Sequence, residues 1–168
     1  MVIGSRHLEL AALVEESALA AAVDALLEGG EKDRVMFNLS PRHGKSLLSS
    51  ELFPSGYLGR HRDRTIIASS KGAELATDFG RKVWNHVAAR VFRAVFPRAA
   101  VSGDSTTAHR FNLAAGGAYY AVGAGGAMTG RGADLLIDDP IKNREDADSA
   151  AYRKGLHEWC EARLTPDS

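Results

Sequence analysis

The sequence predicts an α/β domain of three layers, with a mostly parallel sheet and helices on both of its faces. Two observations lead to this prediction. Short apolar runs of strand length alternate along the chain with segments of helical periodicity, and one run is continuously apolar until it ends in carboxylates. Both features are typical of α/β proteins, whose parallel strands are buried. With 168 residues, 45% hydrophobic and 25% charged, the chain is expected to form a single domain.

The first expected elements are a helix, a strand and a second helix. Apolar residues recur at helical spacing within residues 8–27, and the run "RVMFNL" at residues 34–39 has the length of a strand. The segment "KSLLSSELF" at residues 45–53 suits a helix, which Pro54 is expected to stop. A loop at residues 40–44 therefore connects a strand to a helix.

The middle of the chain predicts a strand, a long helix and a hairpin. The run "RTIIAS" at residues 64–69 is β-branched at its centre, and apolar residues four positions apart from Leu75 to Val91 indicate a helix. The runs "HRFNL" and "AYYAVG" are expected to pair as a hairpin, with glycines in the turn at residues 114–117. A last helix is expected at residues 145–164, with Trp159 on its apolar face.

The segment "SPRHGKS" at residues 40–46 is interpreted as a phosphate-binding loop, or P-loop. The usual pattern is GxxxxGK[ST], and this chain has Leu39 in place of the first glycine, so the match is partial. Its position between a strand and a helix supports the interpretation, because backbone N–H groups then converge on phosphate oxygens. The alternative is a basic turn that contains Gly-Lys-Ser by chance.

Residues of such a loop have expected roles. Lys45 would place its ammonium against the β- and γ-phosphates, Ser46 would ligate Mg²⁺, and Gly44 would allow the close approach. The residues expected to contact the nucleotide are Pro41, Arg42, His43, Gly44, Lys45 and Ser46. The sequence therefore predicts ATP and Mg²⁺ as cofactors.

A second motif, "LLIDDP", follows at the end of the apolar run "ADLLID", residues 133–138. A Walker B element is a buried strand that delivers an acidic residue to its carboxyl end, where open α/β sheets bind their ligands. Asp138 is expected to hold the Mg²⁺ shell, and Asp139 would act as general base towards the attacking water. The alternative is that the two aspartates only open a loop before Pro140.

Three stretches together carry a family resemblance: "SPRHGKS", "FPSGYLGRHRDRTIIASSKGAELATDFGRKV" and "AYYAVGAGGAMTGRGADLLIDDPIK". They resemble the ATPase domain of the large terminase subunit of tailed bacteriophages, over most of the chain from Arg34 to Leu164. The resemblance implies a motor that hydrolyses ATP to drive double-stranded DNA into a procapsid. It also implies a ring of identical subunits, contacts with the portal protein and the small terminase subunit, and a location in the host cytoplasm.

The chain departs from the family's pattern at two places. Terminases commonly have Glu after the Walker B Asp, whereas this chain has Asp139, so the catalytic carboxylate is either Asp139 or Glu145. The chain also stops at "EARLTPDS", where the family would continue into further ATPase strands and a nuclease domain. Residues 1–168 are therefore expected to be a partial P-loop domain, in which hydrolysis is impaired even if nucleotide binds.

Two arginines are further candidates for the site. Arg42 lies within the loop, where terminases often carry an arginine, and its planar guanidinium would clamp the γ-phosphate. Arg131, in "TGRGAD" before the Walker B strand, would serve as an arginine finger for a neighbouring subunit in a ring. In both cases the alternative is a solvated loop charge.

Composition narrows the classes of function. Lys plus Arg and Asp plus Glu both total 21, so net charge gives no general argument for a polyanionic partner. A single cysteine, Cys160, excludes an internal disulfide and a cysteine-rich zinc site, and no stretch is apolar enough to predict a membrane span. Two alternatives stay open: another P-loop NTPase, such as a helicase-like protein, and a non-catalytic prophage remnant.

Overall fold

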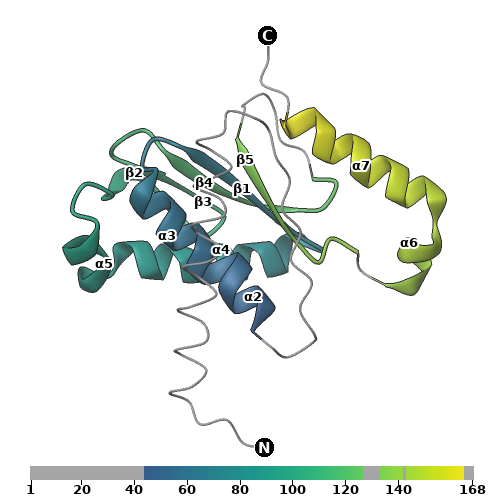
Figure 1. Cartoon of the computed structure of the whole chain (residues 1–168), viewed down its shortest axis with the longest axis horizontal. Helices are drawn as coiled ribbons and strands as arrows, with labels where there is room; N and C mark the ends of the chain where they lie inside the picture. The colour runs from purple at the N-terminus through teal and green to yellow at the C-terminus, as the bar shows by residue number, and fades with distance from the viewer. Residues whose placement is uncertain (1–43, 127–132, 142, 165–168) are drawn as a thin grey trace, which may run out of the picture.

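The computed structural model describes residues 44–126, 133–141 and 143–164 of the chain (Figure 1). Within these residues five strands form one sheet in the order β2-β3-β4-β1-β5. The strands are β1 (Thr65–Ser70), β2 (Val101–Thr107), β3 (Arg110–Leu113), β4 (Ala118–Gly123) and β5 (Asp134–Asp138).

The described residues also form helical segments. They are α2 (Lys45–Leu47), the π-helical segment η1 (Leu48–Leu52), α3 (Phe53–Arg60), α4 (Ala73–Ala88), α5 (Arg90–Val95), α6 (Arg144–Asp148) and α7 (Ala150–Leu164). The helix predicted within residues 8–27 and the strand predicted at 34–39 lie outside the described residues.

Strand β1 is the centre of the parallel part of the sheet. It pairs in parallel with β4 on one side and with β5 on the other, whereas β3 pairs antiparallel with both β2 and β4. The α/β class and the β3–β4 hairpin are therefore confirmed. The prediction of a mostly parallel sheet is wrong for the described strands, because half of the pairings are antiparallel. Short turns join β2 to β3 and β3 to β4, and such turns connect only antiparallel strands.

The hydrophobic core lies between one face of the sheet and the helices α3 and α4, which run across that face (Figure 1). In α4 the side chains of Val83 and Val87 are fully buried, one helical turn apart. On the sheet the rings of Phe111 and Tyr119 stack across the hairpin at 5.1 Å between centroids. The core residues are Tyr57, Leu58, Ile66, Ala68, Val83, Val87, Phe111, Leu113 and Tyr119. This packing fixes α4 and β1 relative to each other.

The sequence predicted that the first described helical run would stop at Pro54, and this prediction is wrong. Segments α2, η1 and α3 follow one another without a break from Lys45 to Arg60. Proline has no N–H to close an α-turn onto the carbonyl four residues earlier, which here belongs to Ser50. The chain instead widens into a π-turn, in which the Phe53 N–H donates to the Leu48 carbonyl, and Pro54 then enters the first turn of α3.

Two other predicted helices are each divided. The helix expected to reach Val91 ends at Ala88, because Ala89 is extended with φ −66° and ψ 146°. Val91 then lies in α5, where it is 76% exposed. The helix predicted at residues 145–164 is split at Ser149 into α6 and α7. Helix α7 lies beside β5, and its Trp159 indole donates to the Gly126 carbonyl at 2.8 Å (Figure 1).

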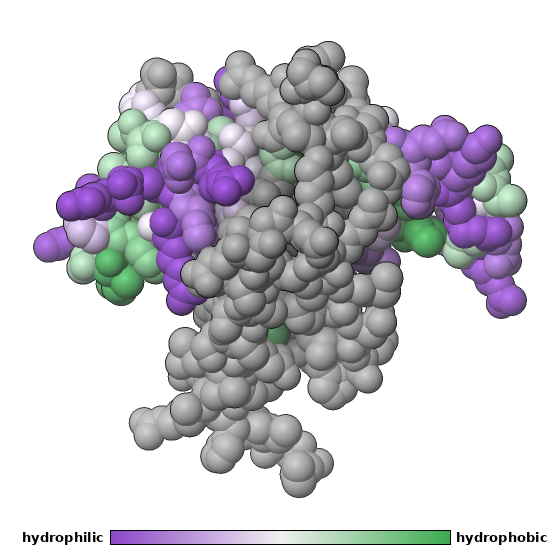
Figure 2. Space-filling model, turned by 45° about the horizontal axis from the view of Figure 1, so that its top comes forward, coloured by the Kyte–Doolittle hydropathy of each residue, from purple (hydrophilic) through white to green (hydrophobic). Residues whose placement is uncertain are grey.

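No helix in the described part of the chain is long and apolar enough to cross a membrane. The surface view in Figure 2 shows hydrophilic side chains at both sides of the picture, with smaller apolar areas beside them. Among the exposed large apolar side chains of the described residues are Val91 and Val95 of α5 and Leu47 of α2.

Candidate functional site

The carboxyl ends of β1 and β5 meet the start of the α2–η1–α3 run. The two strands are parallel neighbours, and their register pairs Ser70 with Asp138, so both strands end at the same level. The buried apolar centre of β1 and its packing on α4 hold this edge in place. In open α/β sheets, the carboxyl ends of the strands are where ligands bind. The sequence motifs therefore meet at the edge of the sheet where a site is expected.

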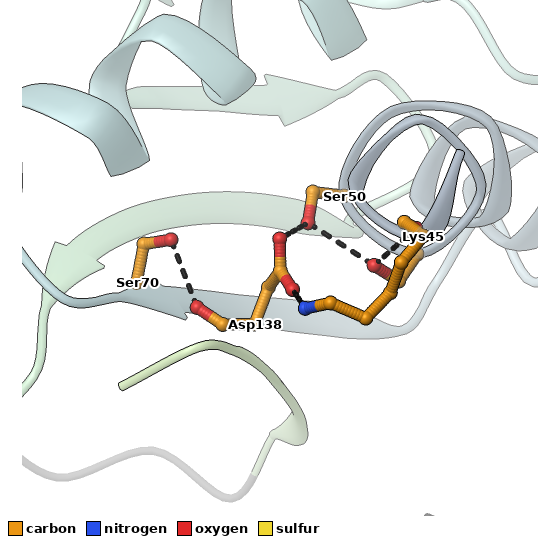
Figure 3. Close-up of polar contacts among 5 residues, drawn as sticks. Lys45, Ser50, Ser70 and Asp138 are labelled. Carbon is orange, nitrogen blue, oxygen red and sulfur yellow. Dashed lines mark hydrogen bonds and ion pairs between the residues drawn. The ribbon is translucent and has the colours of Figure 1, made fainter. Parts of the chain in front are cut away.

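Asp138 is the centre of this cluster and is only 5% exposed. The Lys45 ammonium donates to its Oδ1, and the Ser50 hydroxyl donates to its Oδ2 at 2.8 Å (Figure 3). The Ser46 side chain also donates to this carboxylate. The structure thus brings together Lys45, Ser46 and Asp138, three residues that the sequence predicted for the site.

These donors determine the charge of Asp138. Burial by itself raises the pKa of the carboxyl, because the charged form loses solvation. Hydrogen bonds from Lys45, Ser46 and Ser50, together with the positive charge of Lys45, outweigh burial and hold the pKa of Asp138 below its ordinary value. Asp138 is therefore a carboxylate at neutral pH, as a cation ligand must be.

The backbone after Asp138 turns sharply. The Ser70 hydroxyl donates to the Asp138 carbonyl at 3.0 Å, and the next residue, Asp139, has a left-handed conformation with φ 48° (Figure 3). Aspartate is one of the few residues besides glycine that adopts this conformation with some frequency. The turn leaves Asp139 exposed, directly beside the buried carboxylate of Asp138.

Gly44 precedes Lys45 with φ 82°, a left-handed conformation that favours glycine. Its carbonyl accepts the Leu48 N–H at 2.9 Å and so begins the helical run. A Cβ at this position would meet no atom of the described residues within 4 Å, so among them the need for glycine comes from the backbone conformation and not from crowding. Gly44 is exposed.

The other predicted site residues are placed differently. Glu145 lies exposed in the first turn of α6, and its carboxylate is not among the groups that contact Asp138. The remaining candidates lie outside the described residues: Pro41, Arg42, His43 and Arg131. Among the described residues, the cluster around Asp138 draws its side chains from α2, η1 and the two strand ends.

Sequence reasoning missed Ser50 and Ser70. Ser50 follows Ser46 by four positions on a helical run, so the two share one face, and this spacing is a signal that the motif pattern does not contain. Ser70 ends β1, and only the strand register places it against Asp138. Both hydroxyls are buried.

A divalent cation would find suitable ligands here. No group of three His, Cys, Asp or Glu side chains capable of holding a metal occurs among the described residues. Mg²⁺ does not need such a cage, because it commonly binds one or two carboxylates, waters and the phosphates of its substrate. The carboxylate of Asp138 and the hydroxyl of Ser46 match this donor set.

Comparison with protein-family models, with curated proteins and with solved structures gives no significant match. The likeness to terminases therefore rests on the sequence stretches quoted above.

Proposed function

We propose that this chain is a Mg²⁺-dependent ATPase domain with a three-layer P-loop fold, belonging to a DNA-packaging motor of the terminase type. One observation supports the proposal most directly. Lys45 and Ser46, which follow Gly44 at the start of a helical run, both contact Asp138 at the end of β5. These are the two halves of a P-loop nucleotide site, and they come from distant parts of the sequence.

Nucleotide binding is assigned to the segment that begins at Gly44. Phosphate groups bind well at the start of a helix, where backbone N–H groups lack partners and the helix dipole is positive. Lys45 is the cation for the β- and γ-phosphates, and its side chain is one-third exposed, so it can turn from Asp138 to a phosphate oxygen. His43, Arg42 and Pro41 complete the proposed loop.

Metal binding is assigned to Ser46 and Asp138. When bound, Mg²⁺ neutralises charge on the phosphates and orients them. Asp138 is suited to hold it because its carboxylate is ionised and fixed by several hydrogen bonds. Ser46 contributes its hydroxyl from the first turn of the helical run.

Activation of the attacking water is assigned to Asp139. Two observations support Asp139 over Glu145: it is joined directly to Asp138 and it is exposed at the end of β5, whereas Glu145 lies in α6. The turn at φ 48° directs the two neighbouring carboxylates into different surroundings, one buried and one in solvent. One can hold a cation while the other takes a proton.

The motor function extends the proposal beyond the site and rests on the terminase-like stretches. In that function the substrate is double-stranded DNA, and the chain works as a ring with the portal protein and the small terminase subunit in the host cytoplasm. Arg131 would then act on the nucleotide of a neighbouring subunit, and Arg42 on its own.

Calorimetric titration with Mg²⁺ and a non-hydrolysable ATP analogue tests the nucleotide site. We expect saturable binding by the wild-type chain and none by Lys45→Ala, because the ammonium that faces the phosphates is lost. Lys154→Ala is the matched control, since Lys154 is an exposed lysine of α7 whose ammonium lies 3.7 Å from the exposed carboxylate of Glu158. Equal affinity for wild type and Lys45→Ala would disprove the P-loop assignment.

A further inference from the structure

The two oxygens of the Asp138 carboxylate have different partners. Oδ1 faces the Lys45 ammonium, which is partly exposed, whereas Oδ2 accepts the Ser50 hydroxyl at 2.8 Å in a buried contact. Ser50 is 3% exposed. A hydroxyl that donates to a carboxylate makes a charge-assisted hydrogen bond, which is stronger than a bond between neutral groups. Oδ2 is thus held by a buried hydroxyl, and Oδ1 by an ammonium that is partly exposed.

Ser50 reaches Asp138 from the centre of the π-helical segment η1 (Figure 3). The wider turn of this segment follows from Pro54, which has no N–H for the Ser50 carbonyl. Single π-turns within α-helices occur frequently at functional sites. Here the turn carries a buried hydroxyl that meets the end of β5.

The neighbouring Ser49 shows that this contact is specific to Ser50. Its hydroxyl donates within the helix to the Lys45 carbonyl at 2.8 Å. The two serine oxygens lie 3.3 Å apart, but each hydroxyl has one proton, and both protons are already donated elsewhere. Ser49 therefore has the same chemistry one position away and no contact with Asp138.

We propose that Ser50 is a positioning residue that makes the site selective for Mg²⁺ over Ca²⁺: it holds Oδ2 of Asp138, so that Oδ1 alone is left for a cation once Lys45 has turned to a phosphate. This inference rests on the proposed function. Mg²⁺ requires near-ideal octahedral geometry and is held by single carboxylate oxygens, whereas Ca²⁺ accepts bidentate carboxylates and more ligands. A carboxylate with one oxygen already engaged suits Mg²⁺ and is unsuited to bidentate binding of Ca²⁺.

The role of Ser50 is tested by measuring nucleotide affinity as a function of free Mg²⁺ and, separately, of free Ca²⁺. Ser50→Ala is expected to weaken the Mg²⁺ dependence about tenfold, as is typical when a partner of a metal ligand is removed, while the Ca²⁺ dependence is unchanged or stronger. Ser49→Ala is the matched control and should behave as wild type with both cations. Ser50→Thr, which keeps the hydroxyl, should restore the preference for Mg²⁺.

Thermal unfolding of each variant shows whether Ser50→Ala also lowers the stability of the fold. A purely structural role of Ser50 would affect the binding of both cations alike. If Ser50→Ala lowers the affinity for both cations equally, or leaves the ratio of the two affinities within twofold of wild type, the inference is wrong although the nucleotide site stands. If wild type binds no nucleotide with either cation, the proposed function itself is wrong. The inference is supported if the ratio of Mg²⁺ affinity to Ca²⁺ affinity falls in Ser50→Ala and stays at the wild-type value in Ser49→Ala.

Discussion

Lys45, the first residue of α2, and Asp138, the last residue of β5, form an ion pair between a partly exposed ammonium and a buried carboxylate. The ammonium contacts Oδ1, the oxygen that Ser50 leaves free. Lys45 and a divalent cation would therefore compete for the same oxygen. If Lys45 moves to a phosphate when nucleotide binds, it releases Oδ1 for the cation. A cation on Oδ1 in turn leaves Lys45 available to the phosphate, so nucleotide and cation bind cooperatively.

Removing Lys45 should have opposite effects on the two ligands. In Lys45→Ala we expect the affinity for Mn²⁺ alone to rise severalfold above pH 7, since Oδ1 is released, while nucleotide affinity is lost. Electron paramagnetic resonance of free Mn²⁺ measures the first effect and calorimetry the second. Lys154→Ala should change neither. Weaker Mn²⁺ binding by Lys45→Ala would show that Lys45 does not compete for Oδ1.

The lowered pKa of Asp138 predicts how stability depends on pH. Because the pKa of the folded state lies below the ordinary value of 3.8, this group stabilises the fold fully above that value and loses the contribution as pH falls through the folded pKa. Asp138→Asn should therefore be less stable than wild type at pH 7, with a difference that shrinks in acid. Urea unfolding from pH 7 to pH 3 measures this difference.

The exposed Asp148 of α6 provides the control for that experiment, because its carboxylate pairs with a solvent-exposed Arg144 at 3.5 Å. Asp148→Asn should follow the wild-type curve at each pH. A constant difference between wild type and Asp138→Asn down to the lowest pH would contradict the lowered pKa.

Gly44 and Gly72 form a matched pair for testing the loop backbone. At neither position would a Cβ meet an atom of the described part of the chain within 4 Å, but of the two only Gly44 has a positive φ. Gly44→Ala should cost about 1–2 kcal/mol of stability, the penalty for a left-handed conformation, and weaken nucleotide binding. Gly72→Ala, at an extended φ of −153°, should cost little. Equal unfolding midpoints for the two variants would show that the conformation of Gly44 is not required.

The segments predicted best from the sequence are those in which burial determines the pattern. Helix α4 buries Phe79, Val83 and Val87 at helical spacing, and β5 carries the apolar run Leu135–Ile137, so helical spacing and strand length revealed the two elements. Strand β2 was not predicted, because "VSGDSTT" is polar and contains glycine, and it is an edge strand ordered by pairing with β3. Such pairing is a tertiary effect that local propensity does not contain.

The same distinction applies to the site. Lys45, Ser46 and Asp138 were predicted because phosphate and metal chemistry fixes their types and their positions after a loop or a strand. Ser50 and Ser70 were not predicted, since their contacts with Asp138 depend on the π-turn and on the register of β1 with β5. Ser50 and Ser70 can be assigned to the site only once their contacts with Asp138 are known.

Asp139 is expected to be the catalytic carboxylate, and its left-handed conformation allows a clean test. Replacing it with glycine removes the carboxylate without backbone strain, because glycine adopts φ 48° at no cost. We expect Asp139→Gly to bind Mg²⁺ and an ATP analogue as wild type does, and to abolish phosphate release in a single-turnover assay. Asp139→Ala should also lose stability, by about 1 kcal/mol.

Glu145→Gln is the competing variant in this assay, since Glu145 is the other carboxylate that the sequence leaves as a candidate. Its exposed position in the first turn of α6, away from the contacts of Asp138, predicts phosphate release close to that of wild type. The substitution keeps the size of the side chain, so α6 should remain folded. If Glu145→Gln abolishes phosphate release and Asp139→Gly preserves it, the two roles are reversed, and α6 must approach the nucleotide when hydrolysis occurs.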